Sequence, residues 1–446
     1  MMEQIILLIK KNKINMRIFL ILIFLFFNLK SISSASDLVF FIESAYKNNP
    51  KLKAERESLK ATKENINISR SEFLPSVTVS GTLESAQSTE RTDQSGSSLS
   101  DSSNDTSTQS VSVDQKIFQG FEGYNSLKKS KLEVEQANQK LKNIEQEIIL
   151  KSVTAYYDLV YKTKNRDFNF ANLTLLERQV ESDRSRLQRG EISLTDLSQS
   201  ESSLAGANAS FIAAGNELLA AKTNFERIIR TSVPEEIDDN FSLNLILPNN
   251  LNDALKIAEK NNPKLIISQL DHKISKRDLN IERAKLSPSA SINYTKSKSE
   301  DFSSTVDEVD KESVKATVTW PIIKGGENYS SFKKAKFKKN KSNLILEDTF
   351  NEVKTDTANA WSLYQSTESV LISTQSQVNS AEIANEGITL EYESGNTRTT
   401  LEVIQSRSLL LNARIANAKA EMNFIVSKFK LLAVLGELTL ANIKKS

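Results

Sequence analysis

Two segments of the chain carry apolar residues at helical spacing over a very long distance. One runs from Tyr124 to about Arg189, and the other from Gly325-Gly326 to Gly395. Each predicts a helix of about 65 to 70 residues, or roughly 100 Å at 1.5 Å per residue. Their three-four spacing is typical of a seam packed against neighbouring helices. The seam residues are Val134, Ala137, Leu141, Ile144, Ile148 and Ala155, then Leu346, Phe350, Val353, Thr357, Ala360 and Tyr364.

Shorter segments show a period of two, which predicts strands. Apolar and polar residues alternate around Val77 and Val79, Val111 and Val113, Ile292 and Tyr294, and Val314 and Val318. Between the members of each pair lie the polar stretches 85–110 and 296–312, which predict exposed, mobile loops because they cannot bury a core. The remaining periodic segments predict shorter helices over 37–48, 50–71, 194–230, 252–259, 263–286 and 399–435.

The whole order of elements occurs twice. The hexapeptide KNNPKL stands at 47–52 and again at 260–265, and four prolines mark equivalent places, namely Pro50, Pro75, Pro263 and Pro288. Gly190 and Gly395 likewise end the two long helices at matching positions. We therefore predict two repeats over 36–235 and 251–446, joined by a linker over 236–250. Their strand regions are expected over about 73–119 and about 286–325.

The amino-acid composition excludes several classes of function. The chain has 58 basic and 56 acidic residues among 446, one histidine and no cysteine. Balanced charge argues against a nucleic-acid binder, and the lack of cysteine excludes disulfides and thiol chemistry. We find no phosphate-binding glycine loop, nucleophile elbow or metal motif. No cofactor, metal site or enzymatic activity is therefore expected.

The N-terminus predicts export. Basic residues up to Arg17 precede an apolar run over 18–27 and a small-residue site ending at Ala35, which is the pattern of a signal peptide over 1–35. Translation could begin at Met1 or at Met16. The alternative is a single membrane anchor, but the run is about half of the roughly twenty residues that a spanning helix needs.

The two hairpins raise a problem of closure. Strands of about ten alternating residues suit a tilted crossing of a bilayer, yet four strands cannot close a barrel, and an open edge in lipid leaves costly unpaired backbone groups. If the strands span a membrane, several chains must share one barrel, and three chains give twelve strands. The alternative is a small sheet that caps a helical bundle outside any membrane.

These features together resemble the TolC family of outer-membrane efflux proteins. The resemblance rests on the paired NNPKL helices, FLPSVTV at 73–79, QKIFQG at 115–120, TWPIIKGG at 319–326, RGEISLTDL at 189–197 and YESGNTRTTLEVIQ at 392–405. It implies a mostly α-helical homotrimer with a twelve-strand membrane β-barrel and a twelve-helix tunnel. Such a protein is a passive exit duct in the outer membrane of a Gram-negative bacterium, in contact with outer-membrane lipid. Its partners are a periplasmic adaptor, or membrane fusion protein, and an inner-membrane pump or the ABC transporter of a type I secretion system.

The resemblance also implies a periplasmic gate near Gly190 and Gly395. A tyrosine and an arginine on one coil, here Tyr392 and Arg398, would hold the neighbouring coil that carries Thr195 and Asp196. An acidic pair usually lines the constriction, and this chain has Glu402 at the first place but Gln405 at the second. Ordinary pairing on helix surfaces is the alternative for each of these residues.

Two interpretations remain open from the residues themselves. The protein could be a periplasmic coiled-coil structural or adaptor protein without a pore, although the glycine- and valine-rich β domains of adaptors are missing.

Two basic runs follow the strand regions, and they could face lipid headgroups or simply water. Their members are Lys128, Lys129 and Lys131, then Lys333, Lys334, Lys336, Lys338, Lys339 and Lys341.

Overall fold

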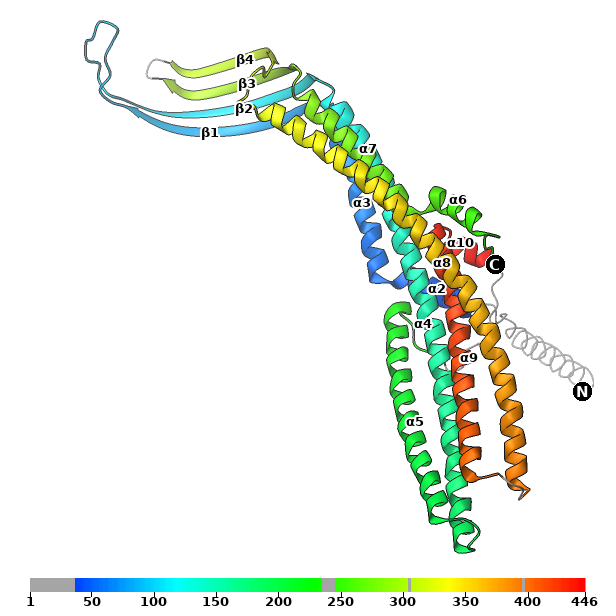
Figure 1. The fold of residues 1–446 in the computed structure, drawn as a ribbon. Coiled ribbons are helices and arrows are strands. Elements are labelled where there is room, and N and C mark those ends of the chain that lie inside the picture. Colours follow the sequence, from blue (N-terminus) through cyan, green and yellow to red (C-terminus); the bar gives the residue numbers. More distant parts are fainter. Residues whose placement is uncertain (1–36, 235–244, 304–305, 395–397, 446) are drawn as a thin grey trace, which may run out of the picture.

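The structure is a computed structural model that describes residues 37–234, 245–303, 306–394 and 398–445. It is a long layer of helices with a four-stranded sheet at one end (Figure 1). The helices are α2 (Asp37–Asn48), α3 (Pro50–Ser71), α4 (Glu122–Gln188), α5 (Leu194–Ile229), α6 (Leu251–Asn261), α7 (Pro263–Ala284), α8 (Glu327–Glu393), α9 (Thr400–Leu435) and α10 (Leu440–Lys445). The strands are β1 (Ser76–Ser88), β2 (Ser102–Gln119), β3 (Ser289–Ser303) and β4 (Val306–Thr319).

The predicted duplication of the element order is confirmed. Helices α3 and α7 each have 22 residues, α4 and α8 each have 67, and α5 and α9 each have 36. Pro50 and Pro263 each occupy the first turn of a helix, where a missing N–H costs nothing. Pro75 and Pro288 directly precede β1 and β3. Gly395 and the proposed signal peptide lie outside the described residues, as does most of the proposed linker.

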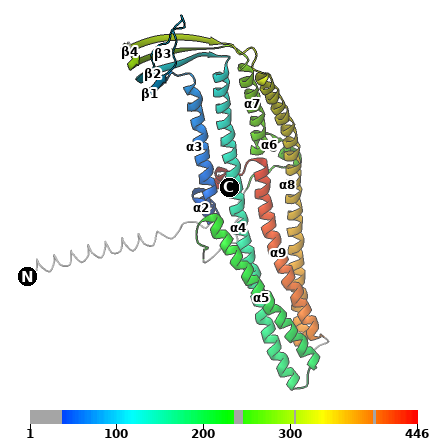
Figure 2. The ribbon, with the colours of Figure 1, turned by 90° about the vertical axis from the view of Figure 1, so that its left-hand side faces the viewer.

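The sheet and the helices next to it share one lateral order. The strands pair in the order β1-β2-β3-β4, all antiparallel. The helices joined to them follow in the same order, with α3 beside α4, α4 beside α7 and α7 beside α8 (Figure 2). In the other half of the layer α5 packs on α4, and α9 packs on both α4 and α8. Each strand therefore continues into its own helix.

The main hydrophobic core lies at mid-length, where α2 and α6 pack against the longer helices and α10 packs against α2. Its largest fully buried side chains include Tyr156 on α4, Phe225 on α5 and Phe429 on α9. Leu38 and Ile42 of α2 enter the same core. No described helix is both long and apolar enough to cross a membrane.

The repeated NNP motif forms a joint between two shorter helices in each half. The Asn49 side chain accepts a hydrogen bond from Lys51 N (3.0 Å) and donates one to the carbonyl of Ile228 near the end of α5 (3.4 Å). Asn262 repeats this arrangement, because it caps α7 and donates to the carbonyl of Val434 near the end of α9 (2.7 Å). Both side chains are buried. Each asparagine caps the N-terminus of α3 or α7 and also donates a hydrogen bond to a carbonyl near the C-terminal end of α5 or α9.

The two predicted loops are shorter than expected. Half of stretch 85–110 is strand, because β1 runs to Ser88 and β2 starts at Ser102, and the connection over 89–101 lies inside the predicted loop. The described part of stretch 296–312 is strand, because β3 runs to Ser303 and β4 starts at Val306. These stretches are rich in serine, threonine and charged residues, so they lack the alternation of apolar and polar residues that predicts a strand. Hydrogen bonds to the partner strand, and not burial of side chains, extend the two hairpins.

Register gives the sheet two different faces. Val77 lies opposite Val113, which lies opposite Tyr294, which lies opposite Val314. In the next row, which points to the other face, Thr78 lies opposite Ser112, which lies opposite Thr295. One face is therefore apolar near the helices, and the other is polar.

The joint can be tested by Asn262→Ala. The substitution removes the cap of α7 and leaves the partly buried Val434 carbonyl without this donor, so we expect a loss of about 1 to 2 kcal/mol of stability. The matched control is Asn250→Ala, which removes the exposed N-cap of α6 and should cost less. Thermal unfolding followed by circular dichroism in detergent compares the two, and equal losses would contradict a special role for the joint.

Candidate functional site

The candidate site lies at the end of the helical layer opposite to the sheet, where α4 turns into α5 and α8 turns into α9 (Figure 1). The first turn uses Gly190 at φ +74°, a left-handed conformation that favours glycine. Arg189 Nε binds Glu191 in this turn at 2.6 Å.

Each returning helix begins with a capping box. Ser193 donates its backbone N–H (3.0 Å) and its hydroxyl (2.7 Å) to Asp196 Oδ2. Thr399 donates its backbone N–H to Glu402 Oε2 (2.7 Å) and its hydroxyl to the same atom (3.1 Å). These bonds hold the pKa of both carboxyl groups below the ordinary values. Both carboxylates therefore act as parts of the N-terminal caps of α5 and α9.

Tyr392 connects the two helical hairpins. Its hydroxyl accepts a hydrogen bond from Arg186 on α4 and lies 3.1 Å from Thr400 Oγ1 on α9. Gln179 Nε2 on α4 approaches the same hydroxyl at 3.5 Å. The guanidinium of Arg186 also stacks over the Tyr392 ring, 5.0 Å from its centroid. A single side chain of α8 therefore holds α4 and α9 by polar and cation–π contacts.

A buried polar network continues inward from this contact. Asp183 is fully buried on α4 and accepts hydrogen bonds from Ser200 Oγ on α5 (2.5 Å) and Gln179 Nε2 (3.0 Å). Gln179 Oε1 in turn accepts from Arg407 Nη1 on α9 (3.3 Å). Burial lowers the pKa of the Arg407 guanidinium, although the nearby acidic groups oppose this shift. The network thus joins α4, α5, α8 and α9 at the turns.

Arg398 is engaged within its own hairpin. Its guanidinium binds Glu391 Oε2 at 2.7 Å and Glu402 Oε1 at 3.0 Å. Thr195 and Gln405 are exposed. Among the described residues, no hydrogen bond or ion pair joins Asp196 to Tyr392 or Arg398. The structure therefore places Tyr392 on the expected hairpin, but its partner there is Arg186.

The sequence interpretation missed the residues that form this contact. Gln179, Asp183 and Arg186 lie at i, i+4 and i+7 on α4, so they share one face of that helix. That spacing is visible in the sequence and is a signal for a polar seam. Nothing in the sequence pairs the seam with Tyr392, because 206 positions separate Arg186 from Tyr392.

Comparison with known proteins gives consistent matches over the chain. The family model described as outer membrane efflux protein matches residues 41–229 and 254–437. The outer membrane efflux protein BepC of Brucella suis biovar 1 is 24% identical over 396 residues, covering 89% of this chain and 84% of that protein. The outer membrane protein TolC of Escherichia coli strain K12 is 24% identical over 423 residues, covering 92% and 84%. The solved CmeC outer membrane channel of Campylobacter jejuni has a TM-score of 0.80 at 15% identity, covering 92% of this chain and 89% of that one.

The contact between the hairpins can be tested by Tyr392→Phe. Losing the hydroxyl breaks the bonds to Arg186 and Thr400, so we expect the α4–α5 turn to separate from the α8–α9 turn. Spin labels at Ser182→Cys and Glu386→Cys, both exposed, report this distance by pulsed electron paramagnetic resonance. The expected result is a longer and broader distance distribution.

Two controls accompany this measurement. Tyr329→Phe removes a hydroxyl from the far end of α8 and should leave the distribution unchanged. Adding Arg186→Gln to Tyr392→Phe should have a smaller effect than Arg186→Gln alone, because the two substitutions share the hydrogen bond between these side chains. Additive effects, or none for Tyr392→Phe, would contradict the assignment.

Proposed function

The chain belongs to the outer membrane efflux protein family, and on that basis we propose that three copies form one passive exit duct across the outer membrane. Members of the family are channels of the Gram-negative outer membrane, not enzymes. The polar network at the hairpin turns would keep the periplasmic mouth of this duct closed. Family membership supports an exit channel over the pore-free adaptor considered from the sequence.

The open sheet edges are the observation that carries the three-copy proposal. β1 and β4 are each paired on one side only within the described residues. Unpaired backbone groups in hydrocarbon cost several kcal/mol each, so a membrane sheet of this kind needs further strands. Three copies in the same order give a closed cylinder of twelve, which lies within the size range of outer-membrane barrels.

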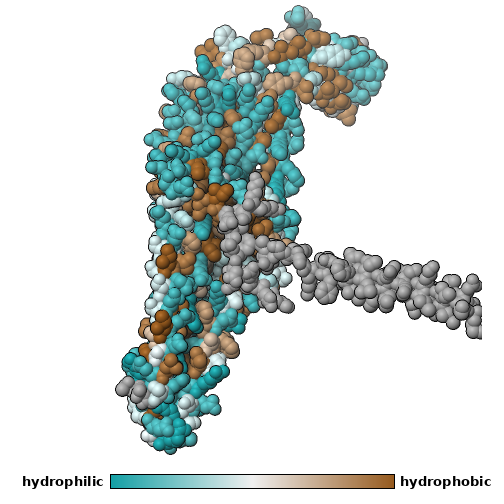
Figure 3. Space-filling view, turned by 90° about the vertical axis from the view of Figure 1, so that its right-hand side faces the viewer, coloured by the Kyte–Doolittle hydropathy of each residue, from teal (hydrophilic) through white to brown (hydrophobic). Residues whose placement is uncertain are grey.

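The helical layer supports the same conclusion. α4, which lies inside the layer, has 22 buried residues, whereas α8 at its edge has seven over the same length. Large apolar side chains of α8 remain exposed, and Figure 3 shows separate hydrophobic patches along the helical layer. The exposed apolar side chains of α8 include Phe337, Leu344, Ile372, Ile383 and Leu390. The free flank of α8 would meet the free flanks of α3 and α5 in the next copy.

The partners follow from this role. A periplasmic adaptor would join the helical end to an inner-membrane pump or ABC transporter, which selects the cargo. Export would depend on the signal peptide proposed for 1–35. The repeats proposed for 36–235 and 251–446 would each supply one hairpin of the barrel and one pair of coils at the mouth.

The trimer can be tested on the full chain in detergent. Native mass spectrometry should give three times the mass of one mature chain. Gel migration should be heat-modifiable, because a closed barrel resists unfolding until it is boiled. A monomer that stays in solution without detergent would contradict the proposal.

The charge at the mouth gives a second test. Arg398 compensates Glu391 and Glu402, so Arg398→Gln should expose two carboxylates per copy and shift the reversal potential in planar bilayers towards cation selectivity. The matched control is Arg414→Gln, because Arg414 pairs with Glu382 (2.8 Å) between the same two helices, farther from the turn. An unchanged potential for Arg398→Gln, or an equal shift for both variants, would count against Arg398 at the constriction.

A further inference from the structure

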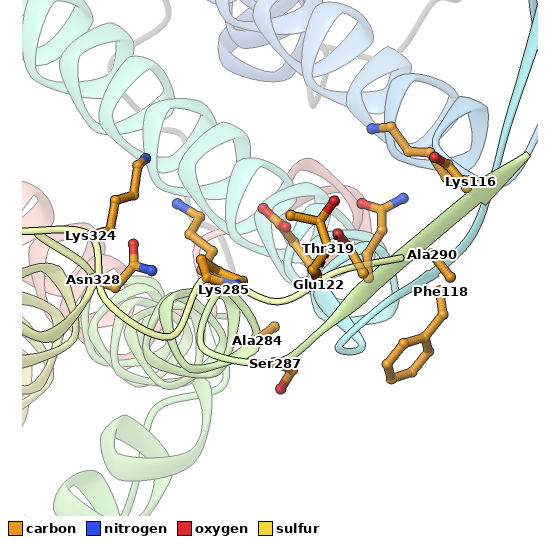
Figure 4. A pocket seen from close by; sticks show the side chains of 14 residues that line it. Lys116, Phe118, Glu122, Ala284, Lys285, Ser287, Ala290, Thr319, Lys324 and Asn328 are labelled. Atoms are coloured by element: carbon orange, nitrogen blue, oxygen red, sulfur yellow. Dashed lines mark hydrogen bonds between the residues drawn. The ribbon is translucent and has the colours of Figure 1, made fainter. Parts of the chain in front are cut away.

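On β3 and β4 the apolar face of the sheet is continuously apolar only in the half next to the helices, whereas on β1 it also carries exposed Leu83, in the row of Glu300. Val77, Val79, Val314 and Val318 are all exposed in the half next to the helices, between 66% and 75%. Phe118 lies on this face opposite Ala290, whereas Lys116 lies on the other face opposite Ser291. Figure 4 shows the Phe118 and Lys116 side chains on opposite sides of β2, although both residues line the same pocket at the base of the sheet.

Beyond Tyr294 the same face becomes charged. Lys296 lies opposite Glu312, Lys298 opposite Asp310 and Glu300 opposite Glu308. Lys298 forms ion pairs with Glu308 (2.7 Å) and Glu300 (3.3 Å). Charged side chains on the lipid face are most costly at the middle of a bilayer and tolerated near its surface. The far half of β3 and β4 is therefore unsuited to hydrocarbon.

The apolar surface continues in the opposite direction, past the end of β4. Ile322 and Ile323, in the connection to α8, are 77% and 89% exposed. Trp320 is exposed beside them and donates its indole N–H to the Leu286 carbonyl at 3.1 Å. β4 ends at Thr319, so the strand part of this surface, Val314 to Thr319, is about 16 Å long at roughly 3.3 Å per residue. The connection over 320–323 adds its exposed apolar side chains to this band.

A group of lysines follows immediately on α8. Residues 327–341 contain six lysines and one acidic residue, Glu327, and Glu327 pairs with Lys324. None of the six forms an ion pair with another described residue, while Lys333 stacks over Tyr329 (4.6 Å). The flank of α3 in a second copy would not neutralise them, since α3 has six basic and three acidic residues. Anionic lipid headgroups suit these lysines, whose stems can lie on apolar surface.

We propose that the bilayer covers the helix-proximal half of the strands together with the strand–helix connections. The lysines at the start of α8 then contact anionic headgroups of the inner leaflet, and the far half of each hairpin projects outside the membrane. The proposal rests on the proposed function, because it requires the sheet to be part of a membrane barrel.

Spin labels test the position of the membrane on the reconstituted full chain. The chain has no cysteine, so single labels can be placed at Val314→Cys, Ile323→Cys and Asp310→Cys. Labels at 314 and 323 should collide more with oxygen than with a water-soluble nickel complex. The label at 310, four residues from 314 on the same face, should show the reverse.

The outcomes separate two kinds of failure. A lipid-exposed label at 310, or a water-exposed label at 323 with 314 in lipid, would overturn the proposed depth alone. A water-exposed label at 314 would instead contradict the membrane barrel itself. A label at Thr317→Cys, on the polar face, should stay accessible to the nickel complex.

Added lipid tests the headgroup contact. Phosphatidylglycerol should raise the Tm of the detergent-solubilised protein more than phosphatidylcholine does, because ligand binding to the native state stabilises it. Lys333→Gln with Lys336→Gln should remove most of this difference. The control pair Lys53→Gln with Lys63→Gln, two exposed lysines of α3, should keep it. Equal Tm shifts with both lipids, or equal losses in both pairs, would overturn the contact.

Discussion

The joint made by Asn49 and Asn262 is the interaction on which the helical layer depends. A helix of 67 residues needs a partner along its length, and each half of the chain provides two shorter ones, of 22 and 36 residues. Where they meet, one helix has free N–H groups and the other has free carbonyls. The buried asparagine accepts a hydrogen bond from an N–H group of one helix and donates one to a carbonyl of the other. The two shorter helices can therefore meet beside the long one.

The same connectivity explains why one chain leaves its edges open. Each strand continues into a helix in the same lateral order, so the sheet and the helical layer end at the same flanks. α4 is covered on both sides, whereas α8 exposes apolar side chains along its free flank. Two repeats therefore leave both flanks of the chain open, and the proposed identical copies would complete a cylinder.

The hairpin turns combine fixed and adjustable contacts. Asp196 and Glu402 are used within their own helices as caps, which fixes where α5 and α9 begin. The contacts between hairpins are made by Tyr392, Arg186, Gln179 and Arg407. These contacts at the turns are polar, while Ile404 of α9 packs on the apolar cluster of Leu173 and Leu176 nearby. Charge at the α8–α9 turn is also locally balanced, because Arg398 binds both Glu391 and Glu402.

The sequence by itself determined the helices, their lengths and the duplication, because periodicity, prolines and turn glycines act over a few neighbouring residues. The family resemblance also pointed to Tyr392 and Arg398, which lie beside the turn between α8 and α9, and their role in a gate stays a prediction. The sequence did not show how far the strands extend, because the Ser- and Thr-rich parts of 85–110 become strand only through hydrogen bonds to a distant partner. Nor did it show that Tyr392 meets Arg186. Only the tertiary structure decided that contact, since it depends on how two long helices, remote in sequence, pack side by side.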